Sequence, residues 1–221
     1  MISKSDPGYR ETLRIKLGKA AIPAPERQLS EWIAAHYAAP RPINVHVDTI
    51  HDGTLPRLNI IFDRRGDGAS FHKKDGSGYN TRKQKRVLKA ARELGVLDRL
   101  EPDEQDKTLV IFSEFENAVR AEAAAAITEA DVDAIRSAMP GPAVWLVSRI
   151  FGCAIVFFET NSEMKSGAGK RAQDAWRTAL QSKSRDYDAC RYFDADPMQV
   201  HFDSRENFEK NYNGNWRAYY N

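Results

Sequence analysis

The sequence has 221 residues, of which 42% are hydrophobic and 29% charged, and its formal net charge is +2. A chain of this length and composition can bury the core of one large domain or of two small ones. It has no run of eighteen apolar residues and no apolar segment at its start, so we expect neither a membrane span nor a secretory leader. Its two cysteines are too few for a disulfide framework, which favours a cytoplasmic location.

The first predicted element is a helix that starts near Pro25. Leu29, Trp32, Ile33 and His36 follow at three- and four-residue spacing, which is typical of an apolar helix face. Prolines then stand at positions 40 and 42. Proline ends a helix and keeps the residue before it extended, so this Pro-x-Pro motif predicts a strand directly after it. We treat residues 1–24 as an N-terminal arm.

The chain continues as a predicted α+β unit. Turn residues in HDGTLP (51–56) predict a hairpin between strands 43–50 and 58–63. A glycine-rich loop follows, then a helix over 81–94 and a strand that starts at 110. The strands IIF and LVIF are almost continuously apolar, which favours positions covered by helices in the middle of a sheet.

The same order of elements then recurs. Pro140 and Pro142 lie 100 residues after Pro40 and Pro42, and strands 143–150, 154–159 and 200–207 lie 100, 96 and 90 residues after their counterparts. The helix over 169–182 lies 88 residues after its counterpart. An alanine-rich segment, 120–130, predicts a stiff helical connection between the two halves.

The repetition predicts the fold class and the domains. We expect an α+β protein of two tandem α-β-β-α-β-α repeats that arose by internal duplication, over residues 25–119 and 120–221. The repeats are expected to pack as one globular unit with a pseudo-twofold arrangement, and their helices to cover a mainly antiparallel sheet that both repeats share. Trp216, Tyr219 and Tyr220, at helical spacing, are expected to dock on the body as a C-terminal tail.

The two halves differ most in charge. Residues 64–92 hold ten Lys or Arg against two Asp, a net charge of +8, whereas residues 93–139 hold four basic against twelve acidic residues, a net charge of −8. Basic residues gathered on one helix and its preceding loop are typical of a surface that binds phosphate groups. The other interpretations are a solvated face balanced by the acidic block and a self-association surface.

The predicted polyanion site combines a loop and a helix. Backbone amides of the glycine-rich loop and the start of the helix are suited to phosphate oxygens, and Phe71 and Tyr79 are candidate stacking surfaces. The expected ligands of the polyanion are the following residues: Arg64, Arg65, Lys73, Lys74, Arg82, Lys85, Arg86, Lys89 and Lys170.

Two His-x-Asp pairs are the candidate metal ligands, although we assign no metal. His46 with Asp48, and His201 with Asp203, place an imidazole and a carboxylate on one face of a strand. The alternative is the polar side of an amphipathic strand. Asp63 and Glu159, at corresponding strand ends, are expected to cap the following turns. None of the local catalytic or cofactor-binding motifs is present, so we expect no cofactor.

We therefore expect a non-enzymatic binding protein whose partner is nucleic acid or another polyanion. One alternative is a module that binds or inhibits another protein through the acidic segment 93–139 and the aromatic C-terminus. The other is a metal-dependent phosphoester hydrolase that uses the two His-x-Asp pairs.

Overall fold

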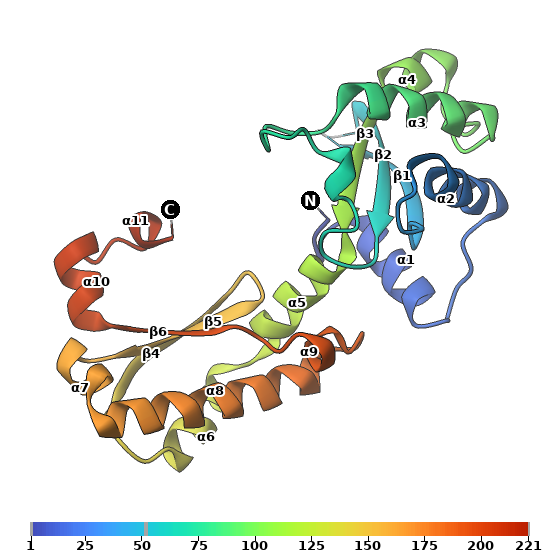
Figure 1. The fold of residues 1–221 in the computed structure, drawn as a ribbon. Helices are drawn as coiled ribbons and strands as arrows, with labels where there is room; N and C mark the ends of the chain where they lie inside the picture. The colour runs from blue at the N-terminus through green and yellow to red at the C-terminus, as the bar shows by residue number, and fades with distance from the viewer. Residues whose placement is uncertain (1, 51–52, 221) are drawn as a thin grey trace. The chain divides into compact units, whose positions relative to one another are not determined.

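A computed structural model of the chain describes residues 2–50 and 53–220 (Figure 1). The chain divides into two compact units, residues 1–118 (unit 1) and 119–221 (unit 2). Both are α+β. No helix in the described part of the chain has the length and apolar character needed to span a membrane.

Unit 1 is built on the sheet order β1-β2-β3. β1 pairs antiparallel with β2, and β2 pairs parallel with β3. The expected hairpin joins β1 to β2, although its residues 51 and 52 lie outside the described part. The elements of the unit are α1 (Pro7–Lys16), α2 (Ala24–Tyr37), β1 (Asn44–Ile50), β2 (Leu55–Phe62), the 3-10 turn η1 (Ala69–Phe71), α3 (Thr81–Glu93), α4 (Pro102–Lys107) and β3 (Leu109–Glu114).

Unit 2 has the sheet order β4-β5-β6, again with one antiparallel pair followed by one parallel pair. The helix α5 (Phe115–Ala126) contains the boundary between the units. The other elements are α6 (Glu129–Ala138), β4 (Val144–Ile150), β5 (Cys153–Phe158), α7 (Asn161–Lys165), α8 (Gly167–Tyr187), α9 (Tyr192–Ala195), β6 (Val200–Ser204), α10 (Arg205–Tyr212) and α11 (Trp216–Tyr219).

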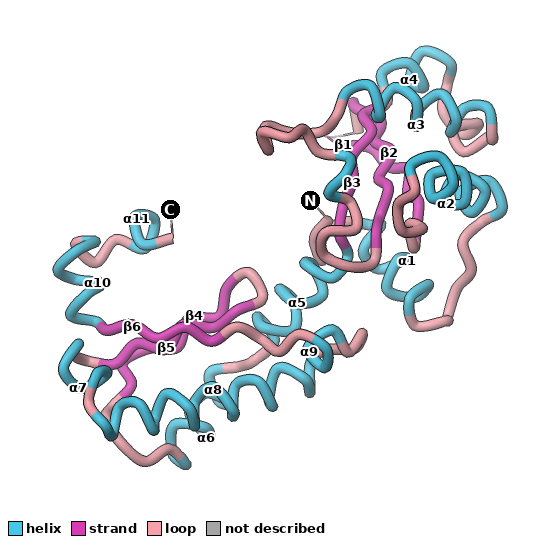
Figure 2. The backbone as a smooth tube through the Cα atoms, viewed as in Figure 1, coloured by secondary structure: helices cyan, strands magenta, loops and turns pink. Residues whose placement is uncertain are grey.

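The sheets correct one part of the predicted fold. The described strands form two separate three-stranded sheets, and each is mixed rather than mainly antiparallel (Figure 2). The reason lies in the connections. A two-strand hairpin gives an antiparallel pair, but α3 and α8 each carry the chain back along the sheet, so the strand that follows runs parallel to its neighbour.

The Pro-x-Pro motifs act as the sequence predicts. α2 ends at Tyr37, Ala38 takes a left-handed backbone with φ of 47°, and β1 begins six residues after Ala38. α6 ends at Ala138, and β4 begins at Val144. Proline cannot continue a helix, and it holds the chain extended until the strand hydrogen bonds begin.

Each face of the unit 1 sheet has a different cover. On the first face, Leu29 and Ile33 of α2 and Val87 of α3 are fully buried with the strand residues Val45 and Leu58. The second face is polar and lies under α1, which comes from the segment expected to be an arm. There the Glu11 carboxylate lies 2.6 Å from His46 Nδ1, Asn44 donates to Thr12 Oγ1, and Arg57 binds Asp48 and Asp6. The α1 helix is therefore held by hydrogen bonds and ion pairs.

In unit 2 the second face is aromatic. Val132 of α6 and Trp176 of α8 fill the first face. On the second face the Phe157 ring packs against Trp216 and Tyr219, and Trp216 stacks on Phe208 at a centroid distance of 4.0 Å. Tyr220 shares a 2.6 Å hydrogen bond with Ser148. The prediction of a docked C-terminal tail is confirmed.

Each unit contains a similar hydrogen-bonded corner, at the place where its last strand leads into the next helix. In unit 1, Glu116 N–H donates to the backbone oxygen of Asp63, and the Glu116 carboxylate accepts from Arg65 N–H at 3.1 Å. In unit 2, Glu206 N–H donates to the oxygen of Glu159, and its carboxylate accepts from Asn161 N–H at 2.9 Å. Asp63 itself binds Lys16 at 2.6 Å.

Candidate polyanion-binding surface

The basic helix α3 is well defined at both ends. The Asn80 side chain accepts a hydrogen bond from Lys83 N–H and caps the first turn, and Gly95 with φ of 76° follows the last turn. Val87, Ala90 and Ala91 are buried against the sheet. The opposite side of the helix therefore faces solvent, and the sequence places four exposed basic residues there: Arg82, Lys85, Arg86 and Lys89.

Most of these charges are not balanced by the acidic block. Within the described residues, no carboxylate lies within ion-pair distance of Arg82, Lys85 or Arg86. Lys89 lies 3.6 Å from Glu93, and both side chains are exposed. The acidic block reaches α3 only at its C-terminal end, where Arg92 binds Asp106 at 2.8 Å. The four exposed residues are called the α3 basic face below.

The basic loop residues are placed differently. Arg64, Arg65, Lys73 and Lys74 are all exposed. At the start of the loop the expected amide cradle is wrong: Arg65 N–H donates to Glu116 and Gly66 N–H to Glu114. Because the protein's own carboxylates occupy these two amides, neither of them is available to an anion.

Phe71 cannot provide a stacking surface. The ring is fully buried and stacks on Phe112 at a centroid distance of 4.4 Å, so that prediction is wrong. Tyr79 is half-buried, and its hydroxyl donates to the backbone oxygen of Phe112. Burial raises the pKa of Tyr79. Both rings serve the unit 1 core because the η1 turn folds the loop inward.

The structure shows an aromatic groove that sequence reasoning missed. It lies between α2 and α3, has a volume of about 410 Å³, and is lined by Trp32, His36, Arg86, Lys89, Ala90 and Glu93. Trp32 and His36 stack with a centroid distance of 4.4 Å and an interplanar angle of 19°. The signal in the sequence was the spacing, because His36 lies seven positions after Leu29 along the same side of α2; unlike Leu29, its side chain is exposed.

Lys170 lies in unit 2, in the first turn of α8, and is exposed. It does not share a unit with the α3 basic face. Farther along α8 the bases are paired with acids: Arg177 with Asp174 at 2.6 Å, and Lys183 with Asp131 at 3.0 Å. The helices α3 and α8 occupy corresponding places in their units, but within the described chain most basic residues of α3 have no carboxylate partner, and α8 has basic residues paired with acidic ones.

The candidate metal ligands lie in two different settings. His46 and Asp48 belong to the network under α1, with His46 Nε2 3.9 Å from Asp48 and Asp48 bound to Arg57. His201 is exposed, and Asp203 accepts from Asn207 and from the Tyr219 hydroxyl. Among the described residues, no three His, Cys, Asp or Glu side chains gather in a way that suits a metal ion.

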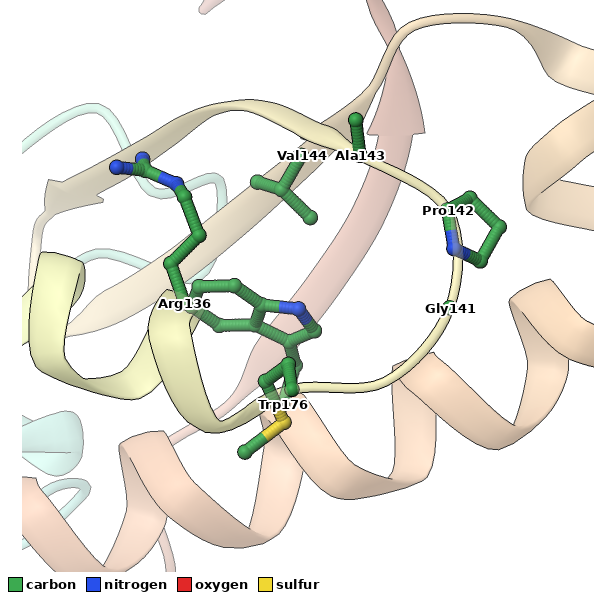
Figure 3. A pocket seen from close by; sticks show the side chains of 7 residues that line it. Arg136, Gly141, Pro142, Ala143, Val144 and Trp176 are labelled. Carbon is green, nitrogen blue, oxygen red and sulfur yellow. The ribbon is translucent and has the colours of Figure 1, made fainter.

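Unit 2 contains a pocket of about 230 Å³ where Gly141, Pro142 and Ala143 bow outward over Trp176 (Figure 3). Its one charged lining residue, Arg136, is bonded to Asp133. The pocket therefore follows from the Pro-x-Pro path and offers little chemistry.

Comparison with protein families, with curated proteins and with solved structures gives no match to this chain.

Proposed function

We propose that this protein is a binding protein that engages a phosphate-rich polymer through the α3 basic face. The observation that supports the proposal is the unbalanced charge: of four exposed bases on one helix side, three have no carboxylate partner in the described chain. Like charges three and four residues apart on a helix are destabilising, so this face carries a repulsive cost in the free protein. A polyanion relieves that repulsion.

The physical signature of such binding is its salt dependence. Each phosphate neutralised by Lys or Arg releases counterions, which lowers the logarithm of affinity by about 0.7 to 0.9 per tenfold rise in salt. A face of four bases therefore contributes a slope of about three. Lys73, Lys74, Arg64 and Arg65 are exposed in the preceding loop of the same unit, and they are the further basic residues proposed to contact the polymer.

The test is binding of a fluorescent oligonucleotide and of heparin as salt is raised. The variant Arg82/Lys85/Arg86/Lys89→Ala is compared with Arg177/Lys183/Arg185/Arg205→Ala, which removes the same charge from unit 2. The control residues each have a carboxylate partner within 4.0 Å. We expect the α3 variant to lose affinity by about tenfold or more and the salt slope to fall by about three, with the control close to wild type.

Equal losses in the two variants would show that only net charge matters, and unchanged binding in the α3 variant would overturn the proposal. The acidic block provides a second comparison. If neutralising Glu101, Asp103, Glu104 and Asp106 abolished capture of a protein partner, the protein-interaction alternative would replace the polyanion proposal.

We further propose that the two units arose by duplication and that the protein works in the cytoplasm. The shared sheet order and the corresponding corners at Glu116 and Glu206 support the first proposal. The scarcity of cysteines supports the second.

A further inference from the structure

The α2/α3 groove joins two kinds of side chain that rarely meet by chance on a surface. One wall is the stacked pair Trp32 and His36 of α2, and the other is Arg86 and Lys89 of the α3 basic face. Ala90, the smallest lining residue, leaves room between the walls. Glu93 adds one negative charge, but it lies 3.6 Å from Lys89, so the lining stays positive overall.

The Trp32 and His36 wall can accept a further flat ring. Trp32 is half-buried and packs on the unit 1 core, which fixes the indole, whereas His36 is exposed. The rings are nearly parallel, and His36 lines the groove, so a third flat ring on the groove side of His36 would continue the same stack. Arg86 and Lys89, across the groove, are placed for the phosphate attached to that ring. Stacking plus neighbouring cations is how proteins hold single strands without reading sequence.

We propose that the α2/α3 groove receives an unpaired nucleobase, so that the polyanion bound by the α3 basic face is single-stranded nucleic acid. This inference rests on the proposed function and narrows its ligand class. In a duplex the bases are stacked on one another, and only their edges are accessible in the grooves. A duplex would contact the basic face through its phosphates alone and would leave the Trp32 and His36 wall unused.

The test compares a single-stranded 20-mer with its duplex and with heparin, using the full chain and fluorescence anisotropy. Because the indole of Trp32 holds the His36 ring in the stack, we expect Trp32→Leu to disorder the ring that receives the base and to weaken single-strand binding by up to the roughly five- to one-hundredfold that one base stack contributes. The heparin elution and duplex affinity of this variant should stay at wild-type values, because the basic residues of α3 are unchanged. Trp32→Phe, which keeps an aromatic ring, should retain most of the single-strand affinity.

Two variants that each remove one positive charge show where the phosphate binds. Arg86→Gln removes a residue that lines the α2/α3 groove, and Lys85→Gln removes a residue of the same basic face that lines a different hollow, beside Thr108 and Leu109. We expect Arg86→Gln to weaken single-strand binding several-fold more than Lys85→Gln. Trp32 is the one tryptophan of unit 1, so quenching of its fluorescence by the single strand should vanish in Trp32→Phe.

The two proposals fail in different ways. If the α3 quadruple variant binds heparin and DNA like wild type, the proposed function fails. If that variant loses binding while Trp32→Leu and Trp32→Phe keep full affinity for the single strand, the polyanion proposal stands and the base site is overturned. Thermal unfolding of both Trp32 variants, followed by circular dichroism, shows whether a loss of binding reflects a loss of fold.

Discussion

The two units use one strand plan for different surfaces. In unit 1, helix α3 exposes four basic residues to solvent, and three of them have no carboxylate partner in the described chain. In unit 2, Arg177 and Lys183 of α8 form ion pairs with acidic residues. The inner sides of both helices are apolar and buried. The sheet therefore dictates only the inner side, and the outer side is where the two units have acquired different properties.

The second sheet faces differ in the same way. In unit 1 the antiparallel pairing of β1 and β2 places His46 beside Asn59 and Asp48 beside Arg57, on the sheet face that α1 covers. In unit 2, β5 places Phe157 on this face, where the aromatic C-terminus covers it. A polar face holds its helix only while its ionic partners are intact, and an aromatic face depends on buried area.

The largest expected effect concerns the buried arginines, one in each unit. Arg57 is bonded to two carboxylates, Asp48 and Asp6, that are themselves largely buried. Arg57→Met leaves these charges without their partner, which should lower the free energy of unfolding by about 3–5 kcal/mol. Arg120, fully buried, donates to the backbone oxygen of Asp196, whose own side chain is half exposed. Arg120→Met should therefore cost less, about 1–3 kcal/mol. Urea unfolding of each variant measures both losses, and equal losses would remove the contrast.

A smaller effect concerns the two corners. Glu116 is buried and accepts from Arg65 N–H, so Glu116→Ala should cost about 1.5–3 kcal/mol, whereas Glu206 is exposed and Glu206→Ala should cost less than about 1 kcal/mol. In each variant the amide that loses its acceptor, at Arg65 or Asn161, should exchange hydrogen faster. If only one of the two amides responds, the corners are not equivalent and the duplication loses its main support.

The smallest effect is a pH dependence of the polar second face of the unit 1 sheet. The hydrogen bond from His46 holds the pKa of Glu11 below its ordinary value of 4.5. Because the lowered pKa belongs to the folded state, Glu11 contributes stability above pH 4.5, and that contribution disappears as the pH falls through the lowered value. Glu11 is 38% exposed, so the contribution is below about 1 kcal/mol.

Glu11→Gln should lack this contribution and show a flatter stability profile between pH 3 and 6. In unit 2, burial and the hydrogen bond to Asp203 raise the pKa of Tyr219, which moves its titration further from acid. Hydrogen exchange, corrected for the intrinsic effect of pH, is followed at the backbone amides of β1 and β5, whose second faces carry His46 and Phe157. An equal acid loss of protection in β5 would contradict the contrast.

Local sequence patterns predict the elements well. The helix with Leu29 and Ile33, the two Pro-x-Pro motifs and the order of strands and helices along the chain all follow from spacing and proline chemistry. The parallel pairing of the last strand in each sheet was missed, because it depends on the path of α3 and α8 and not on the residues of the strand itself. α1 was missed because it buries few large apolar side chains, Tyr9 among them, and its specific partners lie on β1 and β2.

The candidate site was predictable only in part. A charge count finds the α3 basic face, because exposed bases at helical spacing need no partner to be recognised. Burial of Phe71 and occupation of the Arg65 and Gly66 amides depend on contacts with residues more than 40 positions away. The aromatic groove exists only because α2 lies beside α3, which neither helix specifies alone.

The helix α5 has a consequence for cooperativity. Phe115, at its start, packs on Tyr9 of unit 1, whereas Ala123 and Ala124, near its end, belong to the unit 2 core. In a continuous helix the carbonyls of residues 115–118 are bonded by the amides of residues 119–122, so each unit supplies half of the same hydrogen bonds. A fragment cut at the boundary would leave those groups unbonded at a new chain end. Unfolding of either unit should thus propagate into its neighbour through a shared backbone, and fragments meant to fold alone need the whole of α5.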